Sequence, residues 1–97
     1  MTGGMEWQPY DPAWLVALAR ETVPGDPWLA DALATCTRAS QESRAYLYFV
    51  DPARPNEPGS AWQLAETVVL HHPREGDLVL DVLKDGRIGG VEFLKRL

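Results

Sequence analysis

Two carboxylates, Asp81 and Glu92, are the residues of this sequence best placed to do chemistry. They lie in two apolar-rich segments of strand length, and antiparallel pairing of those segments makes them diagonal neighbours on one face. Diagonal Cβ atoms lie roughly 7–8 Å apart, a separation at which two carboxylates can flank a water molecule or share a cation. Gly90, opposite Asp81, would leave space for a ligand. The alternative is that both acids are solvent-facing residues that discourage edge pairing.

Nitrogen and oxygen ligands also occur together at His71, His72 and Glu75. Adjacent residues of a strand point to opposite faces, so the two imidazoles cannot readily hold one metal ion. We therefore expect no metal site and no cofactor. One histidine should be solvated and the other half-packed at the end of a strand.

Aromatic residues offer a second kind of site, since the chain has four tryptophans. Trp14 and Trp28 occupy matching positions in two predicted helices, where an indole ordinarily packs in the core. Trp62 is a candidate ligand-binding residue beside a proline-rich loop, together with Trp7. Two tyrosines, at positions 46 and 48, share one strand face and should be half-buried.

The segment 76–94 is predicted to form a β-hairpin that positions the two acids. Asp85 and Gly86 suit the positive φ angles of a two-residue turn, which pairs Leu78 with Phe93 and Asp81 with Gly90. One face is then free of charge and holds Leu78, Leu80, Val82, Val91 and Phe93. The other face holds Asp77, Val79, Asp81, Leu83, Ile88, Glu92 and Leu94. A three-residue loop would shift the register by one and mix Glu92 into the apolar set, so we favour the two-residue loop.

Two helix signals precede the hairpin. Asp11-Pro12 and Asp26-Pro27 each combine a favoured N-cap residue with a proline in the first turn. They predict helices over residues 12–23 and 27–40, each with an apolar stripe. Residues 1–10 contain two glycines and a proline and predict a flexible arm, which Trp7 and Tyr10 could tether.

The apolar period changes from about 3.6 residues to about 2 at Ala45. Residues 45–50 and 62–72 predict strands, and the proline-rich residues 53–60 predict a loop. Residues at the start of the second strand are also compatible with a short helical turn. The expected fold class is α+β: two N-terminal antiparallel helices packed on one face of a four-stranded antiparallel meander sheet. We expect a single domain, 1–97, with the arm at 1–10, a helical hairpin at 11–40 and the sheet at 45–94.

Three segments of the predicted sheet form a longer pattern: AYLYF at 45–49, GDLVLD at 76–81 and DGRIGGVEFL at 85–94. In these segments the chain resembles the small bacterial family described as domain of unknown function 2283. That family has an A-L-Y-I strand, a strand ending in an acidic residue, an Asp-Gly turn and a closing G-I-E-I-L strand. The resemblance covers about half of the chain and implies a compact antiparallel β-module with no catalytic residues to carry over. Gly89 departs from the pattern, because the family usually has an apolar residue there, and the helical half falls outside it.

Charge and composition restrict the partners. Nine Lys and Arg against 14 Asp and Glu give a net charge of −5, and no basic cluster exceeds Lys95-Arg96, which argues against nucleic acid. The single cysteine, Cys36, cannot form an internal disulfide, which favours a reducing cytoplasm, and it is expected to be buried on a helix. Because the sequence has no apolar run of membrane-spanning length and no signal-peptide pattern, we expect a soluble, unprocessed chain without membrane contact.

The second hairpin face predicts association. Val79, Leu83, Ile88 and Leu94 accompany its acids, and two short helices can cover only one face of the sheet. Exposed apolar residues call for a partner, most simply a second copy. We therefore expect a small non-catalytic protein-interaction module, such as a bacterial regulator, antitoxin or immunity-type protein acting as a homodimer. The alternative is a small metal- or ligand-dependent enzyme that uses Asp81, Glu92 and His71 or His72.

Overall fold

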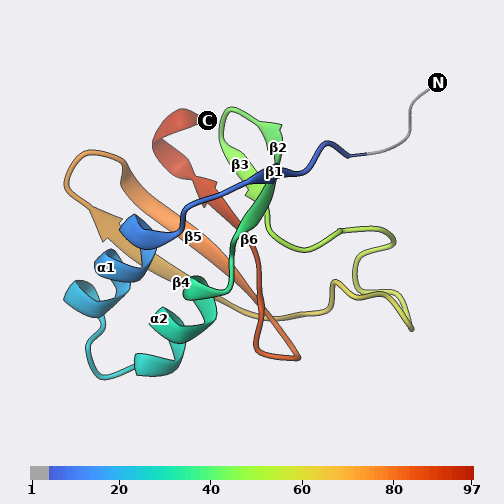
Figure 1. The fold of residues 1–97 in the computed structure, drawn as a ribbon, viewed down its shortest axis with the longest axis horizontal. Coiled ribbons are helices and arrows are strands. Elements are labelled where there is room, and N and C mark those ends of the chain that lie inside the picture. The colour runs from blue at the N-terminus through green and yellow to red at the C-terminus, as the bar shows by residue number, and fades with distance from the viewer. Residues whose placement is uncertain (1–4) are drawn as a thin grey trace.

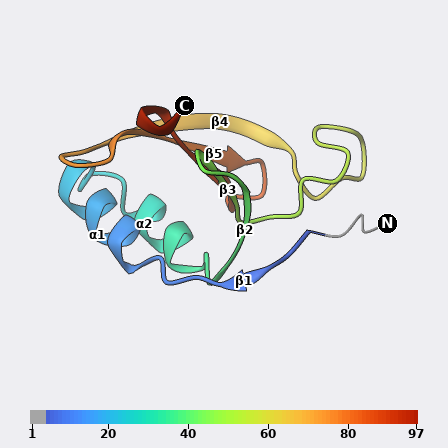
Figure 2. The ribbon, with the colours of Figure 1, turned by 90° about the horizontal axis from the view of Figure 1, so that it is seen from above.

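The computed structural model describes residues 5–97, which form a six-stranded antiparallel sheet with two helices on one side (Figures 1 and 2). In chain order the elements are β1 (Gln8–Pro9), α1 (Ala13–Thr22), α2 (Pro27–Ala34), β2 (Arg38–Ser43), β3 (Tyr46–Tyr48), β4 (Leu64–His72), β5 (Gly76–Leu83), β6 (Ile88–Phe93) and the 3-10 helix η1 (Leu94–Arg96). The α+β class is confirmed. The predicted sheet of four strands lacked β1 and β2. No helix of the described residues is long and apolar enough to cross a membrane.

The strand order is β1-β2-β3-β6-β5-β4, so the predicted meander order is wrong. β3 pairs with β6, through Tyr46 opposite Glu92 and Tyr48 opposite Gly90, and not with the strand that follows it in sequence. The connection over residues 49–63 leads instead to the opposite edge of the sheet (Figure 1). Its length allows this crossing, and Trp62 anchors it in a small buried cluster with Val50 and Leu83.

The N-terminal segment adds the sixth strand. Gln8 and Pro9 pair with Ala39 and Arg38 of β2, and the Trp14 indole N–H donates to the Tyr10 hydroxyl at 2.8 Å. The predicted flexible arm is therefore wrong for residues 8–10, while its residues 1–4 lie outside the described residues. Tyr10 tethers the segment, as its ring also contacts Phe49.

The second helix is shorter than predicted, because residues 38–40 belong to β2. The apolar stripe of α2 stops near Cys36, and the small residues Ala39 and Ser40 are buried in the strand that follows. The beginning of this segment pairs with β1, through Arg38 and Ala39, and the remainder pairs with β3, through Ser40, Gln41 and Ser43.

The main core lies between the helices and the sheet. All five residues of the predicted charge-free hairpin face are buried there, which confirms that face: Leu78, Leu80, Val82, Val91 and Phe93. Leu15 and Leu18 of α1 pack against the same cluster. Trp14 stacks on the Phe93 ring at a centroid distance of 6.1 Å, as expected of a core indole. Trp28 was also expected to pack in the core, but this prediction is wrong, because its side chain is 42% exposed on α2.

The hairpin register is correct along most of its length and changes near the turn. Asp81 pairs with Gly90, but Val82 pairs with Ile88, so Gly89 is an extra residue in a β-bulge. The turn itself has a three-residue loop: Gly86 has a φ of +89°, and the Leu83 N–H donates to the Arg87 carbonyl at 2.8 Å. The predicted two-residue loop is therefore wrong. The bulge restores the predicted pairing beyond the turn and moves Ile88 into the main core.

Gly89 is expected to tolerate no side chain. An added Cβ would lie 2.5 Å from Trp62 Nε1 and 2.8 Å from Leu83 Cδ2. We expect Gly89→Ala to lower the free energy of unfolding by about 1–3 kcal/mol, measured by urea denaturation. The matched control is Gly25→Ala, where an added Cβ meets no atom within 4 Å, so the change should stay within about 0.5 kcal/mol. Equal stability of the two variants would contradict this packing.

Candidate functional site on the open face of the sheet

The open face is the side of the sheet turned away from α1 and α2 (Figure 2). In β3, β4, β5 and β6, alternation from the buried positions assigns to it Tyr46, Tyr48, Thr67, Val69, His71, Asp77, Val79, Asp81, Gly90 and Glu92. Asp81 and Glu92 thus share a face, as predicted. None of these ten strand residues is a lysine or an arginine.

Tyr46 spans the middle of this face. Its hydroxyl donates a hydrogen bond to the carboxylate of Asp81, although β6 lies between their strands. The ring can cross β6 because Gly90 has no side chain: a Cβ there would lie 2.7 Å from Tyr46 Cε1 and 2.6 Å from the Leu47 carbonyl oxygen. The space expected beside Asp81 for a ligand is therefore filled by Tyr46.

Tyr48 completes a group that we call the tyrosine–acid cluster: Tyr46, Tyr48, Asp81 and Glu92. The two tyrosine rings pack edge to face with centroids 4.7 Å apart. Glu92 lies directly opposite Tyr46 on the neighbouring strand. Aromatic faces and carboxylates both attract ammonium and guanidinium groups. The cluster is therefore suited to a cationic ligand group.

Partial burial perturbs the ionisable groups of the cluster. Burial raises the pKa of the Asp81 carboxyl, and the hydrogen bond from Tyr46 opposes that shift. Burial, together with the hydrogen bond and charge of Asp81, raises the pKa of Tyr46. The pKa of Tyr48 is raised by burial and by the negative charges of Glu42 and Asp81. Both tyrosines thus keep their hydroxyl protons at neutral pH.

The histidines lie apart from the two acids. His71 is exposed at one end of the open face, where its Nδ1 contacts the carboxylate of Asp77 opposite it. His72 points to the helix side, where its Nδ1 accepts from the backbone N–H groups of Arg74 and Glu75 at 3.1 and 3.0 Å. One solvated and one half-packed histidine were predicted, which is confirmed. Residues 5–97 contain no group of three or more His, Cys, Asp or Glu side chains placed to hold a metal ion.

Three residues predicted for surfaces are buried instead. Trp62 is 8% exposed and its indole N–H lies against Gly89, so it offers no surface to a ligand. Leu83 and Ile88 are each 1% exposed. Leu83 lies in the cluster around Trp62, and Ile88 lies in the main core. Of the four predicted interface residues, only Val79, which is half-buried, and Leu94, which is 40% exposed, keep surface for a partner.

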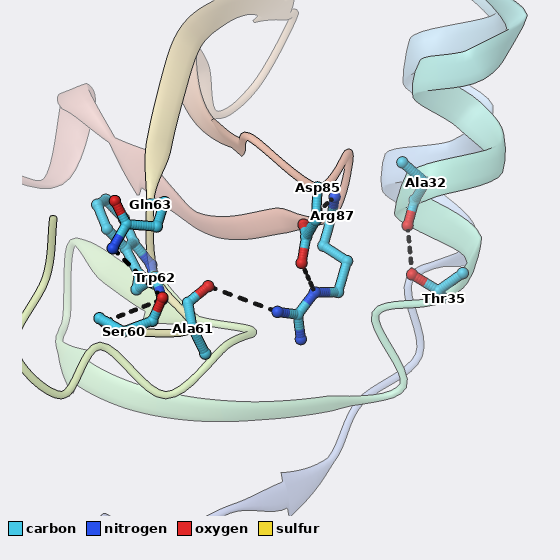
Figure 3. Close-up of polar contacts among 8 residues, drawn as sticks. All are labelled: Ala32, Thr35, Ser60, Ala61, Trp62, Gln63, Asp85 and Arg87. Atoms are coloured by element: carbon cyan, nitrogen blue, oxygen red, sulfur yellow. Dashed lines mark hydrogen bonds and ion pairs between the residues drawn. The ribbon is translucent and has the colours of Figure 1, made fainter. Parts of the chain in front are cut away.

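A hollow lies beside the hairpin turn and was not predicted, because its walls come from distant parts of the sequence. It has a volume of about 430 Å³ and is lined by Trp7, Thr35, Thr37, Arg38, Phe49, Val50, Asp51, Ala61 and Arg87. Arg87 is held by Asp85 at 2.7 Å and by the Ala61 carbonyl at 3.5 Å (Figure 3). Thr35 donates its hydroxyl to the Ala32 carbonyl at 2.7 Å (Figure 3). Arg87 and Thr35 thus serve the fold, and Arg38 lies over the Trp7 ring at 5.7 Å from its centroid.

Cys36 has no chemical role in this arrangement. The side chain is 5% exposed, and burial raises the pKa of its thiol to about 12. The thiolate that a nucleophile requires is therefore scarce at neutral pH. The predicted burial of Cys36 is confirmed, but its predicted place on a helix is wrong, because α2 ends at Ala34.

Tyr46 and Tyr48 are the site residues that sequence reasoning missed. Their shared strand face was recognised, but the meander order placed that strand beside β4 and away from the two acids. The signal that could have found them is Gly90, a glycine in mid-strand, since such a residue often marks a close approach of another group.

Comparison of the chain with family models, with curated proteins and with solved structures gave no match. The resemblance of residues 45–94 to the domain of unknown function 2283 family stays a prediction.

Asp81 should make stability depend on pH. Because burial raises its pKa above the ordinary 3.8, the folded chain binds this proton more tightly than the unfolded chain. Its contribution to the free energy of unfolding is present at low pH and is lost as pH rises through the raised pKa. The difference between wild type and Asp81→Asn should therefore fall as pH increases from the ordinary value of 3.8 through the raised pKa, as measured by urea unfolding at each pH.

Asp85→Asn is a control variant for which we expect the opposite dependence of stability on pH. Burial acts to raise the pKa of Asp85, but the hydrogen bonds and the charge of Arg87 together lower it. The difference between wild type and this variant should therefore rise as pH increases from the lowered pKa of Asp85 to the ordinary value of 3.8. Parallel trends for the two variants would contradict the assigned environment of Asp81.

Proposed function

We propose that this chain is a non-catalytic protein-interaction module that binds a basic surface of a partner protein through its open face. The observation that carries the proposal is the tyrosine–acid cluster, in which Tyr46 is bonded to Asp81 above Gly90 and packed against Tyr48. Among the ten open-face residues of β3, β4, β5 and β6 there is no lysine or arginine.

The composition of the open face supports a protein partner. Tyrosines are enriched at protein interfaces, where a large ring gives contact area and its hydroxyl needs a hydrogen-bond partner. Tyr46 is already oriented by Asp81, so less side-chain freedom is lost when a partner binds. Val69, 57% exposed, and Val79 extend the face with apolar surface.

The charge of the face supports a basic partner. Asp81 and Glu92 have no cationic strand neighbour on the open face, and the whole chain carries a net charge of −5. Two copies packed face to face would bring these carboxylates together, and like charges across an interface are unfavourable. A basic protein therefore fits this face better than a second copy does. An antitoxin, an immunity-type protein or a small regulator would have such a task.

The alternative of an enzyme receives less support from the geometry. It requires a histidine beside Asp81 and Glu92, whereas His71 is paired with Asp77 and His72 lies on the helix side. Asp81 is also engaged by Tyr46, which fills the space where a substrate would bind.

Reversing a charge on the open face should abolish partner capture. We expect affinity-tagged wild-type chain to retain a partner from lysate of its native cells, and Glu92→Lys to bind that partner at least about tenfold more weakly. The purified partner would then be titrated against each variant by calorimetry at two salt concentrations, because an electrostatic interface weakens with salt.

Asp31→Lys is the matched control, since it makes the same charge change at an exposed position of α2, in the helical layer. This variant should bind as wild type does. A partner that binds all three proteins equally, or a wild type that retains no more than Glu92→Lys, would refute the proposed use of the open face.

A further inference from the structure

The two edges of the sheet differ in how well they are protected from pairing. β1 is an edge of two residues, one of them Pro9, which has no N–H to donate. β4 is an edge of nine residues, Leu64–His72. The preceding connection covers only its beginning, where the Leu64 N–H donates to the Asn56 side-chain oxygen at 2.9 Å.

The remainder of β4 lacks the features that keep edge strands apart. Residues 66–72 read ETVVLHH and include no lysine, arginine or proline, and the one bulge in the strand lies before Glu66. Val69, in the middle of this segment, is 57% exposed. A long regular edge of this kind is a template for another strand.

We propose that β4 pairs with β4 of a second copy of this chain, antiparallel, across a two-fold axis at Val69. In that register Val69 lies opposite its own copy, Thr67 opposite His71, and Glu66 opposite His72. Residues at opposite positions of an antiparallel ladder share a face, and the faces agree, because 67, 69 and 71 belong to the open face and 68 and 70 to the helix side. The exposed valine gains an apolar contact, and each glutamate gains a histidine partner on the other copy.

Neighbouring registers are less complementary. An axis at Val68 would place the carboxylate of Glu66 opposite Leu70, a residue of the main core. An axis at Leu70 would place Pro73 in the ladder opposite Thr67, where it could not donate a hydrogen bond. The register centred on Val69 avoids both defects, and self-complementary pairing about one axis closes the assembly at two copies.

This dimer uses a different surface from the proposed partner interface. A two-fold axis normal to the sheet keeps both open faces on the same side, so the two tyrosine–acid clusters would form parts of one extended anionic surface. The edge pairing does not depend on the open face binding any partner, so either proposal can fail without the other.

Disulfide formation across the axis tests the register. Directly opposite Cβ atoms of a ladder lie about 4.5–5.5 Å apart, within reach of a disulfide after small adjustments. In a glutathione redox buffer, in which oxidised glutathione accepts the two electrons and the two protons of the joined thiols, Val69→Cys should convert to a covalent dimer. Cys36 does not compete, because it is 5% exposed.

Thr67→Cys is the matched control on the same strand face. In the proposed register the two introduced thiols would be displaced by four residues, roughly 13 Å along the strand, and should remain unlinked. Wild type should sediment as a dimer at about 100 μM, and Val69→Lys, which opposes two ammonium groups at the axis, should sediment as a monomer. A monomeric wild type at that concentration, or equal cross-linking of the two cysteine variants, would overturn the inference.

Discussion

Gly89, the residue left out of the pairing between β5 and β6, is the constraint on which the rest of this structure depends. The left-handed Gly86 sets a three-residue loop, while the central strands must keep Leu80 and Val91 directed toward the helices. Both conditions hold only because one residue is left out of the ladder between Gly90 and Ile88. Trp62 packs against the bulge from the long connection and thereby ties the hairpin turn to the segment that leads into β4.

The bulge also separates the core from the open face. It turns Ile88 into the main core and leaves Gly90 opposite Asp81. With no side chain at Gly90, the Tyr46 ring crosses β6 and bonds to Asp81, which converts a solvated strand carboxylate into a partly buried one. A single backbone irregularity thus accounts both for the packing of the hairpin and for the arrangement of the residues available for recognition.

The proposed activities follow from surfaces that the fold leaves without cover. The open face has aromatic and acidic side chains held in fixed positions, a combination suited to binding a basic protein. The β4 edge has backbone groups and an exposed valine in a self-complementary sequence. The alternative enzyme would need a histidine and space for a ligand beside Asp81 and Glu92. Tyr46 fills the space beside Asp81, and His71 contacts Asp77 instead.

The sequence by itself determined the local features of this protein. The periods of the apolar residues identified both helices, the hairpin, its buried face and the shared face of Asp81 and Glu92, because burial of neighbouring side chains depends on short-range geometry. Only the tertiary structure decided that β3 lies beside β6, that residues 38–43 form a strand, and that Tyr46 meets Asp81. These features depend on pairing between segments distant in the chain. That pairing is selected by backbone hydrogen bonds between distant strands and by the burial of the whole core, which no local period records.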